Sequence, residues 1–302
     1  MADASVFDLT QETVMTAAAR IPLQETSGAT RATSATFALL GGLETETSRD
    51  TNANHADFNG VVGQLHCVDM SGASLTSEVV MTLPATAAVG ERVGVYITAG
   101  SSTDGEELSV RTPASDTING TDYSAADWSR LFITGEVVVF RCIVANTDWI
   151  VEHDGRIPAI CLAYDDTGLA VSTTGATPSF SAINDNGSML DTTNDWVKLR
   201  RKSSVEIRTW WLTGATIDDG NYSEAVIQVD AAGTPVNTAQ QRATASAGNM
   251  RLGMDIGIFG NYLDGETFDM YTAVQNAGGN YTSGSTATNQ LTIKFYVAEV
   301  GW

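Results

Sequence analysis

The sequence predicts a mainly β protein, and three patterns support this fold class. Apolar and polar side chains alternate along residues 290–300, as they do in a strand with one buried face. Between residues 60 and 164, short runs rich in β-branched residues recur about every ten positions, separated by turn-forming Gly, Asn, Asp and Ser. Beyond residue 196, about five to eight further runs show no helical period. The chain is therefore expected to fold as packed sheets.

The stretch 290–300 organises the C-terminal region. Its apolar positions are Leu291, Ile293, Phe295 and Val297, and those between them are Thr292, Lys294, Tyr296 and Ala298. A terminal strand this apolar needs partners from earlier in the chain. We therefore expect residues 196–302 to form a jelly-roll sandwich that is closed by its own last strand.

Three further segments precede the jelly roll. Residues 1–58 are expected to be a short N-terminal attachment segment, with one helix capped by Asp8 and another over residues 34–41. Helices this short are not stable alone, so the segment should pack on symmetry mates or on another protein. Residues 59–164 are expected to form a central β-sandwich or stacked hairpins. Residues 165–195, rich in Gly, Ser and Thr, are expected to be a linker or long loop.

The charge balance argues against nucleic acid as a partner. The chain has 36 acidic and 16 basic residues and a formal net charge of −20. Proteins bind nucleic acid mainly through Lys and Arg side chains that neutralise phosphates. The same negative charge would keep a crowded, repetitive assembly soluble.

The sequence also predicts where the protein is made. The N-terminus lacks a basic region followed by an apolar run, so no signal peptide is expected. No segment approaches the roughly 20 apolar residues of a membrane span. Cys67, Cys142 and Cys161 each have apolar neighbours and are expected to be buried, unpaired thiols in a reducing compartment. Synthesis in the cytoplasm follows.

Residues 20–43 resemble the N-terminal attachment motif of tail-fibre and other virion appendage proteins of tailed phages. In that motif a strand of Ile or Leu, Pro and a few polar residues precedes a Gly turn, a basic residue with Thr, and an apolar helix. The matching residues are Ile21, Pro22, Leu23, Gly28, Arg31, Ala32, Thr33, Phe37, Ala38, Leu39 and Leu40. The resemblance implies docking to the virion through Ile21, Pro22, Leu23, Arg31, Leu39 and Leu40.

Two more regions are similar to modules of such fibres. Residues 82–95 and 146–151 resemble a β-module in which a strand ending in Pro and a charged strand are closed by a hairpin with a polar turn and a Trp. Residues 196–302 resemble the trimeric jelly roll of C1q-like and tumour-necrosis-factor-like proteins, a common distal head on phage fibres. The chain lacks the long fibrous repeats of a full-length tail fibre.

The resemblance implies a homotrimeric virion protein, a tail fibre or spike that docks by its N-terminus and presents a β head to the host. Its implied partners are copies of itself, other virion proteins, and a host-surface glycan or receptor. Two alternatives stay open. One is a capsid decoration or head-fibre protein, and the other is a fibre-borne glycan hydrolase or esterase.

No catalytic signature accompanies these patterns. The chain has neither a phosphate-binding loop nor a nucleophile elbow, so no enzyme activity and no cofactor are expected. His66 and Cys67 with Cys142 are a poor zinc set, because adjacent strand residues point to opposite faces. Acidic turns could hold Ca²⁺, although solvated turn residues are the simpler interpretation. They contain Asp165, Asp166, Asp185, Asp218, Asp219, Asp264 and Glu266.

Trp210 and Trp211 cannot both enter one core. Alternation along the expected strand 205–211 buries Trp211 with Val205 and Ile207 and leaves Trp210 on the other face. Trp210 is then either partly exposed against a long neighbouring side chain or in contact with another subunit.

Two other groups are candidate contacts with a partner or receptor. The basic cluster 198–202, which includes Arg200 and Arg201, either protects a strand edge or meets an acidic surface of a neighbouring copy. Tyrosines in or beside Gly-rich and Asn-rich loops either stack on a host sugar or fill a trimer seam. They are Tyr222, Tyr262, Tyr271 and Tyr281.

Overall fold

The structure is a computed structural model that describes most of the chain. The described residues are 20–24, 30–34, 45–50, 57–71, 78–103, 105–165, 170–171, 177–212, 222–231, 234–244, 253–275, 281–282 and 293–302. In these ranges the chain forms strands β1 to β25 and no helix, which confirms the mainly β prediction. No membrane-spanning helix is found among the described residues.

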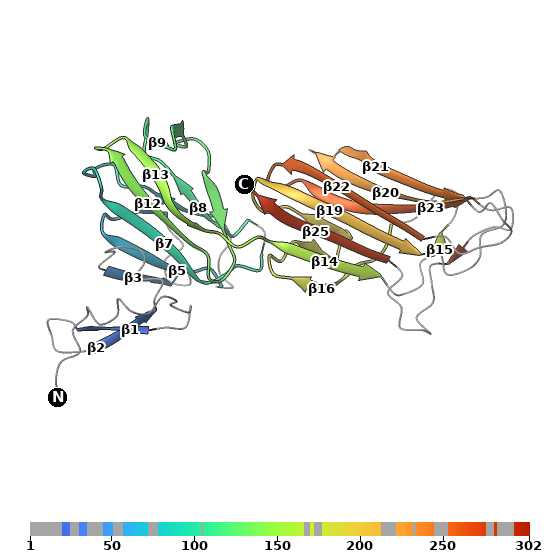
Figure 1. Ribbon diagram of the computed structural model, residues 1–302, viewed down its shortest axis with the longest axis horizontal. Coiled ribbons are helices and arrows are strands. Elements are labelled where there is room, and N and C mark those ends of the chain that lie inside the picture. Colours follow the sequence, from blue (N-terminus) through green and yellow to red (C-terminus); the bar gives the residue numbers. More distant parts are fainter. Residues whose placement is uncertain are drawn as a thin grey trace, which may run out of the picture.

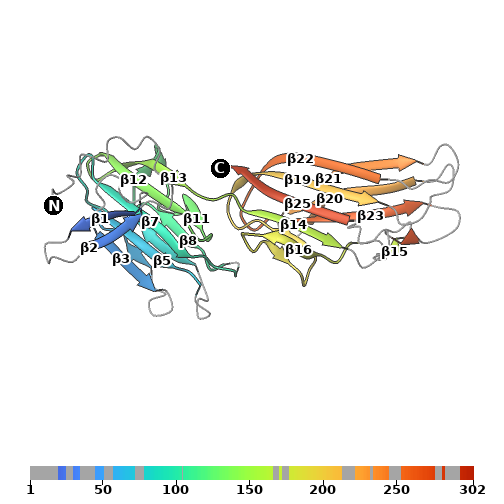
Figure 2. The ribbon, with the colours of Figure 1, turned by 60° about the horizontal axis from the view of Figure 1, so that its bottom comes forward.

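Two β-bodies lie end to end along the long axis of the molecule (Figures 1 and 2). Among the described strands, the chain passes from the first body to the second once, through residues 156–159. The C-terminus returns to the junction between the bodies (Figure 2). This junction is therefore crossed by one covalent link and by the side chains around it.

The first body packs a seven-stranded sheet against a four-stranded sheet. The larger sheet has the order β10 (Thr121–Asp122), β9 (Thr117–Ile118), β13 (Asp148–Gly155), β12 (Val137–Val144), β7 (Arg92–Ala99), β5 (Gln64–Asp69) and β3 (Thr45–Asp50). The smaller sheet has the order β11 (Ser129–Leu131), β8 (Leu108–Arg111), β6 (Val79–Thr82) and β4 (Phe58–Asn59).

Strands β3 to β8 alternate between the two sheets of the first body. As a result β3, β5 and β7 are parallel neighbours, and so are β4, β6 and β8. Each connection between consecutive strands crosses to the other sheet. The strand after that lies back in the first sheet, parallel to the strand that it pairs with there. Strand β12 then pairs antiparallel with β7, and β13 pairs antiparallel with β12.

Strand β12 is buried on both faces, as the sequence predicts for a central strand. Val138, Phe140 and Cys142 face the core between the two sheets. Val137 and Val139 belong to a smaller cluster on the other side of the sheet. The strand therefore fixes the seven-stranded sheet between two apolar layers.

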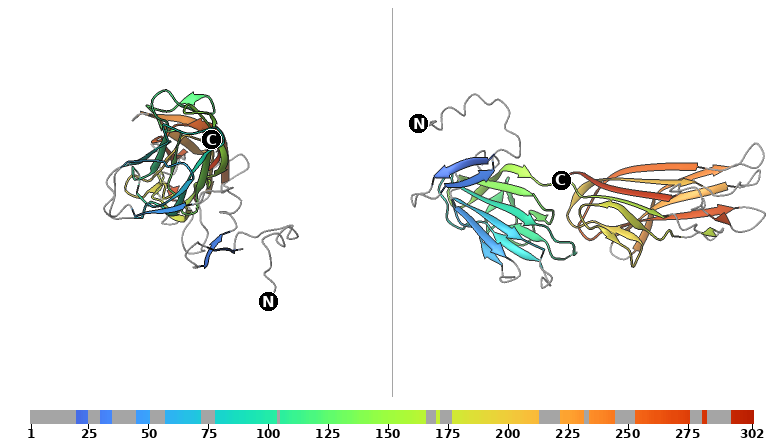
Figure 3. Two further views of the ribbon diagram at one scale, coloured as in Figure 1. Left: turned by 90° about the vertical axis from the view of Figure 1, so that its left-hand side faces the viewer. Right: turned by 90° about the horizontal axis from the view of Figure 1, so that it is seen from below.

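The second body packs two five-stranded sheets, with strands that run roughly along the long axis (Figure 3). One sheet has the order β16 (Ser181–Asp185), β14 (Ile160–Asp165), β25 (Ile293–Gly301), β19 (Ser203–Leu212) and β22 (Gly253–Tyr262). The other has the order β17 (Leu190–Asp191), β18 (Trp196–Lys198), β23 (Thr267–Gln275), β20 (Tyr222–Ala231) and β21 (Thr234–Thr244). A separate pair joins β15 (Ala170–Val171) to β24 (Tyr281–Thr282).

Strand order identifies the second body as a jelly-roll sandwich. From β18 onward the chain moves to the other sheet at β19, back at β20, across again at β22, back at β23 and finally to β25. Two five-stranded sheets wound in this way form a jelly roll. The predicted fold class is therefore confirmed.

The alternation predicted for two strands of this body is also confirmed. Ile293, Phe295 and Val297 of β25 are fully buried between the sheets. In β19, Trp211 is buried in the same core, whereas Trp210 is half-buried on the outer face. The closing strand lies inside its sheet, between β14 and β19.

The N-terminal hairpin pairs β1 (Arg20–Gln24) with β2 (Thr30–Ser34). Its strands contain Ile21, Pro22, Leu23 and Arg31 of the expected docking motif, whose side chains lie outside the described part of the structure. Leu39, Leu40 and the helix expected after Asp8 lie outside the described residues. Ser34, where the second helix was expected to begin, is the last residue of β2.

Three of the expected boundaries differ from the observed sheets. Residues 160–164, expected to end the central domain, form most of β14, which pairs with β25, so the jelly roll begins at residue 160 rather than at 196. The segment 1–58 includes β3, which pairs with β5 and so belongs to the first body. The prediction of a linker over residues 165–195 is wrong for its second half, because β16 and β17 lie there. Phe180 and Met189 bury their side chains in the second core and Leu190 packs against it, so these apolar residues anchor a segment that is mostly polar.

The three cysteines are unpaired and buried, as predicted. Burial raises the pKa of the Cys161 thiol far above its ordinary range, with a smaller contribution from Asp185. The thiol is therefore neutral and packs as a small apolar group.

Candidate functional site

Two buried arginines join the two bodies. Arg200 and Arg201 follow β18 in the second body, and each is only 1% exposed. A guanidinium cannot be buried without partners, because an unpaired charge in a low-dielectric interior is costly. Both side chains find these partners across the junction.

Arg201 binds carboxylates from both bodies. Its Nη1 donates to Glu136 Oε1 of the first body at 2.5 Å, and its Nη2 donates to Glu299 Oε2 of the second body at 2.7 Å. Nη1 and Nη2 also donate to the carbonyls of Arg130 and Ile157. Burial by itself lowers the pKa of Arg201, but the two carboxylates more than offset this and raise it above its ordinary value. Arg201 is therefore charged.

Arg200 enters a different part of the first body. Its Nε donates to Glu107 Oε1 at 2.8 Å, and Nη1 and Nη2 donate to the carbonyls of Ser101 and Thr103 at 2.8 and 2.6 Å. Nη1 also donates to the carbonyl of Gly187 at 3.0 Å. One carboxylate and three carbonyls thus enclose this guanidinium.

Phe132 of the first body lies against both guanidinium groups. The Cζ atoms of Arg200 and Arg201 are 4.4 and 4.9 Å from the centre of its ring. Phe132 is itself buried in the core of the second body. Nearby, Glu136 accepts the backbone N–H groups of Phe132 and Ile157, so its carboxylate is held on several sides. The described residues of the junction thus form a polar core in which Arg200 pairs with Glu107, and Arg201 pairs with Glu136 and Glu299; Glu107 Oε2 is buried there without a hydrogen-bond partner.

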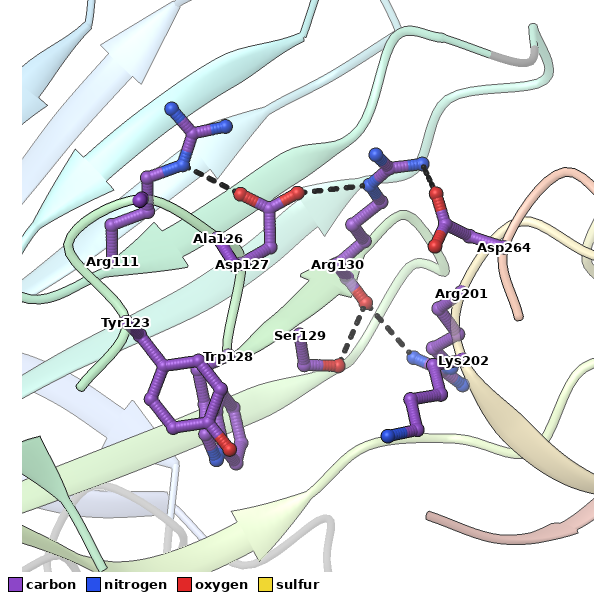
Figure 4. Close-up of a pocket in the computed structure, with 11 residues that line it drawn as sticks. Arg111, Tyr123, Ala126, Asp127, Trp128, Ser129, Arg130, Arg201, Lys202 and Asp264 are labelled. Carbon is purple, nitrogen blue, oxygen red and sulfur yellow. Dashed lines mark hydrogen bonds and ion pairs between the residues drawn. The ribbon is translucent and has the colours of Figure 1, made fainter. Parts of the chain in front are cut away.

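An open cleft lies beside this junction. It consists of two adjoining cavities of about 430 and 750 Å³, both lined by Tyr123, Trp128 and Lys202. The smaller cavity reaches Asp264 and the larger reaches Trp302, so both bodies contribute to each. Figure 4 shows the smaller cavity, with the Lys202 side chain extended toward the side on which Tyr123 and Trp128 lie.

Ion pairs hold the wall of the smaller cavity. Arg130 donates to Asp127 at 3.3 Å and pairs with Asp264 of the second body at 2.9 Å. Arg111 donates to the other oxygen of Asp127 at 2.6 Å (Figure 4). This chain of charges continues the link between the bodies out to the surface.

Arg156 organises the aromatic residues of the larger cavity. Its Cζ lies 4.4 Å from the ring centre of Trp128 and 4.5 Å from that of Trp302. Asp154 Oδ2 accepts from Arg156 Nη2 at 2.7 Å and from Trp302 Nε1 at 3.0 Å. Arg201 Cζ also lies 4.9 Å from the ring centre of Trp302. The Arg156–Asp154 ion pair thus holds both tryptophan rings, one from each body, and Arg201 adds a contact to the second.

The cleft carboxylates are poorly suited to donate protons. Burial raises the pKa of Asp127 and of Asp154, but pairing with arginines outweighs it, and both values are below the ordinary range. Glu78, which shares a hydrogen bond with Asp127, has a raised pKa, first because of burial. Asp127 and Asp154 are therefore ionised near neutral pH and serve as acceptors in the walls of the cleft.

The expectation that Arg200 and Arg201 contact a partner copy is wrong. Both are buried within the chain, and their acidic partners are its own Glu107, Glu136 and Glu299. A sequence pattern cannot show this, because these carboxylates lie 65 to 98 positions away along the chain.

The predicted aromatic contacts lie on different parts of the second body. Trp210 and Tyr222 are half-buried on β19 and β20. Tyr262 packs edge-on against Phe268, with ring centres 4.9 Å apart, so it is tied to the core. Tyr271 and Tyr281 lie in β23 and β24, and their side chains are outside the described part.

Of the predicted aromatics whose side chains are described, Trp210, Tyr222 and Tyr262, none lines the junction cleft. Sequence reasoning missed the rings that do, namely Tyr123, Trp128 and Trp302. The one available signal was the basic cluster 198–202, which includes Lys202.

The described residues contain no group of three or more side chains able to hold a metal ion. His66 is buried, and its Nε2 accepts from the backbone of Val61. Several acidic turn residues bind their own loops: Asp185 accepts the N–H groups of Met189 and Leu190, and Glu266 accepts that of Leu263. Calcium binding by the remaining turns stays a prediction.

No known protein family matches the chain, and no curated protein matches it. Among solved structures, murine APRIL at pH 8.0 is similar at 8% identity with a TM-score of 0.36, covering 48% of this chain and all of that one. Eiger TNF from S. frugiperda is similar at 11% identity with a TM-score of 0.38, covering 48% of this chain and 94% of that one. Likenesses this distant say nothing about function, and the jelly-roll assignment rests on strand order.

Proposed function

We propose that the chain is a structural, non-catalytic protein of a tailed-phage virion, a short fibre or spike whose second body is the distal head. The observation that supports this best is the locked junction, where Arg201 binds carboxylates of both bodies. A stem must hold its head in a fixed direction, whereas an enzyme that closes over its substrate needs a hinge. The virion location rests on the resemblance of residues 20–43 to attachment motifs.

The outer face of the β16-β14-β25-β19-β22 sheet is the proposed contact between copies in a homotrimer. Tyr164 and Leu162 of β14, Tyr296 of β25, Trp210 of β19 and Phe259 of β22 lie on this face, opposite the core. Phe259 is 70% exposed. Aromatic residues are enriched in surfaces that meet another protein, and on this face they alternate with charged side chains.

The charges on this face also favour contact with an identical copy. Two basic residues, Lys294 and Arg208, alternate with two acidic ones, Glu206 and Asp255, so the face is neutral. Most of the chain is strongly acidic and would repel a second copy. A neutral aromatic face is where identical subunits can approach.

Mass measurement of the purified full chain tests the trimer. Light scattering should give about three times the chain mass of 31.9 kDa. Trp210→Glu places a charge in the proposed contact and should give a single chain with an unchanged circular dichroism spectrum. Val144→Glu is the control, because Val144 is 48% exposed on the first body. A wild-type protein that stays single would refute the trimer.

Imaging of labelled particles tests the place in the virion. Gold-labelled antibody against the second body should decorate the tail. Label spread over the head shell would replace the fibre proposal with capsid decoration. Product formation from host polysaccharide by the purified protein would contradict the non-catalytic assignment.

A further inference from the structure

We infer that the cleft beside the junction binds a short oligosaccharide that carries one carboxylated sugar. This inference deepens the proposed host-surface role and rests on it for its biological meaning. The proposed glycan site is therefore the cleft between the two bodies and not the tyrosines of the second body.

The shape of the cleft suits a small ligand. Its larger cavity has a volume of about 750 Å³ and lies at a domain interface. Sites for small ligands are typically clefts of about 300–1,000 Å³ at such interfaces, with aromatic walls and a few polar groups. The smaller cavity of about 430 Å³ continues from it past Tyr123, Trp128 and Lys202, so an extended ligand has room along both.

The aromatic rings favour a sugar over other polar ligands. The face of an aromatic ring carries partial negative charge and attracts C–H groups with partial positive charge, such as those on one face of a pyranose. Trp302 is 46% exposed, and its Nε1 is already bonded to Asp154. Arg156 fixes Trp128 and Trp302 together. Rings held in this way lose little conformational entropy when a ligand binds.

Two amides supply hydrogen-bond donors for hydroxyl groups. Asn119 Oδ1 accepts from the backbone N–H of Val151, and Asn261 Oδ1 accepts from Ser204 Oγ. These bonds orient the side chains and use their oxygens. Neither amide nitrogen has a hydrogen-bond partner among the described residues, and both asparagines line the larger cavity.

The charge of the ligand follows from Lys202. Four arginines line the cleft, and each is paired with at least one carboxylate; they are Arg111, Arg130, Arg156 and Arg201. Lys202 is exposed and has no ion pair with any described residue. One open ammonium group among neutralised pairs matches one anionic group on the ligand. The chain has a net charge of −20, so most of its surface repels an anionic ligand, whereas the Lys202 ammonium attracts one.

The test measures binding of defined probes to the purified full chain by saturation-transfer NMR and calorimetry. The probes are sialyllactose and an oligosaccharide of alternating glucuronic acid and N-acetylglucosamine, each also in a form whose carboxyl is reduced to an alcohol. At least one acidic probe should bind, about tenfold more tightly than its reduced form, and added salt should remove most of that difference. Absence of binding by both acidic probes would overturn the inference, as would equal binding of the reduced forms.

Variants then locate the site. Lys202→Gln should weaken binding of the acidic probe about tenfold and leave the reduced probe unaffected, whereas Trp302→Ala should weaken both. Arg92→Gln is the matched control, because it removes a cation on β7 that does not line the cleft. Binding that survives both cleft variants would place the site elsewhere and refute the inference. These readouts do not depend on oligomeric state or particle location, so the trimer and virion proposals can fail separately.

Discussion

The buried junction and the open cleft lie side by side, and three consecutive bases differ in their environment there, although Arg201 reaches the wall of the smaller cavity. Arg200 and Arg201 are buried and fully paired, whereas Lys202 is exposed in the cleft. Arginine suits the interior because its planar, weakly hydrated fork meets several acceptors at once, while the compact ammonium of lysine is strongly hydrated. The contrast teaches that a basic cluster in a sequence need not have one role.

The largest expected loss of stability comes from replacing a buried arginine of the junction. Arg201→Met leaves Glu136 and Glu299 buried without their counter-ion, and removing one partner of a buried pair costs about 3–5 kcal/mol. Urea unfolding monitored by fluorescence should show this loss. Arg92→Met removes a surface ion pair with Glu152 and should cost less than about 1 kcal/mol. Equal losses in the two variants would mean that the junction contributes no special stability.

A smaller loss should follow when the ring beneath the two guanidiniums is removed. Phe132→Leu keeps most of the apolar volume but ends both cation–π contacts, each worth about 2 kcal/mol when desolvated. Thermal unfolding should therefore show a loss of about 2–4 kcal/mol. The control is Phe140→Leu in the first core, which removes a ring without a cation above it. If Phe140→Leu costs as much, packing alone explains the effect.

Lowering the pH should weaken the contacts of Asp154 with Arg156 and Trp302 in the cleft wall before it affects the apolar cores of the two bodies. The pKa of Asp154 is lowered, so its pairing stabilises the folded state above the ordinary value of 3.8 and is lost as pH falls through the lower folded value. The stability difference between wild type and Asp154→Asn should thus be constant near neutrality and shrink below about pH 4. A difference that grows on acidification would contradict this sign.

The smallest expected change in stability comes from replacing the exposed Lys202. Lys202→Gln should change the free energy of unfolding by no more than about 0.5 kcal/mol, because substitutions at exposed positions without partners are nearly neutral. The same denaturation experiment as for Arg201→Met gives the direct contrast. A loss of several kcal/mol would show that Lys202 belongs to the junction after all.

Periodicity was sufficient to predict strands that have one apolar face. Strand β25 and the split between Trp210 and Trp211 in β19 follow directly from alternation. Strand β21, with the sequence TPVNTAQQRAT, has no such pattern, and its place is set by backbone pairing with β20 at the edge of the sheet. The parallel coil of β3 to β8 was also missed, because strands that alternate between layers look the same in sequence as hairpins.

The candidate site was beyond prediction for a different reason. Trp128 and Trp302 are far apart in the sequence and meet only because the last strand ends at the junction. Arg201 and Glu299 are 98 positions apart. Composition shows that the charges exist, but only the fold decides which of them meet.

The position of Trp302 affects how the protein can be handled in the laboratory. Trp302 lines the cleft. Figure 2 shows the end of the chain midway along the molecule rather than at a tip. An affinity tag or fluorescent fusion attached after residue 302 would emerge there and crowd both the cleft and the neighbouring body. We expect such a fusion to weaken the proposed binding at the cleft while the protein folds normally.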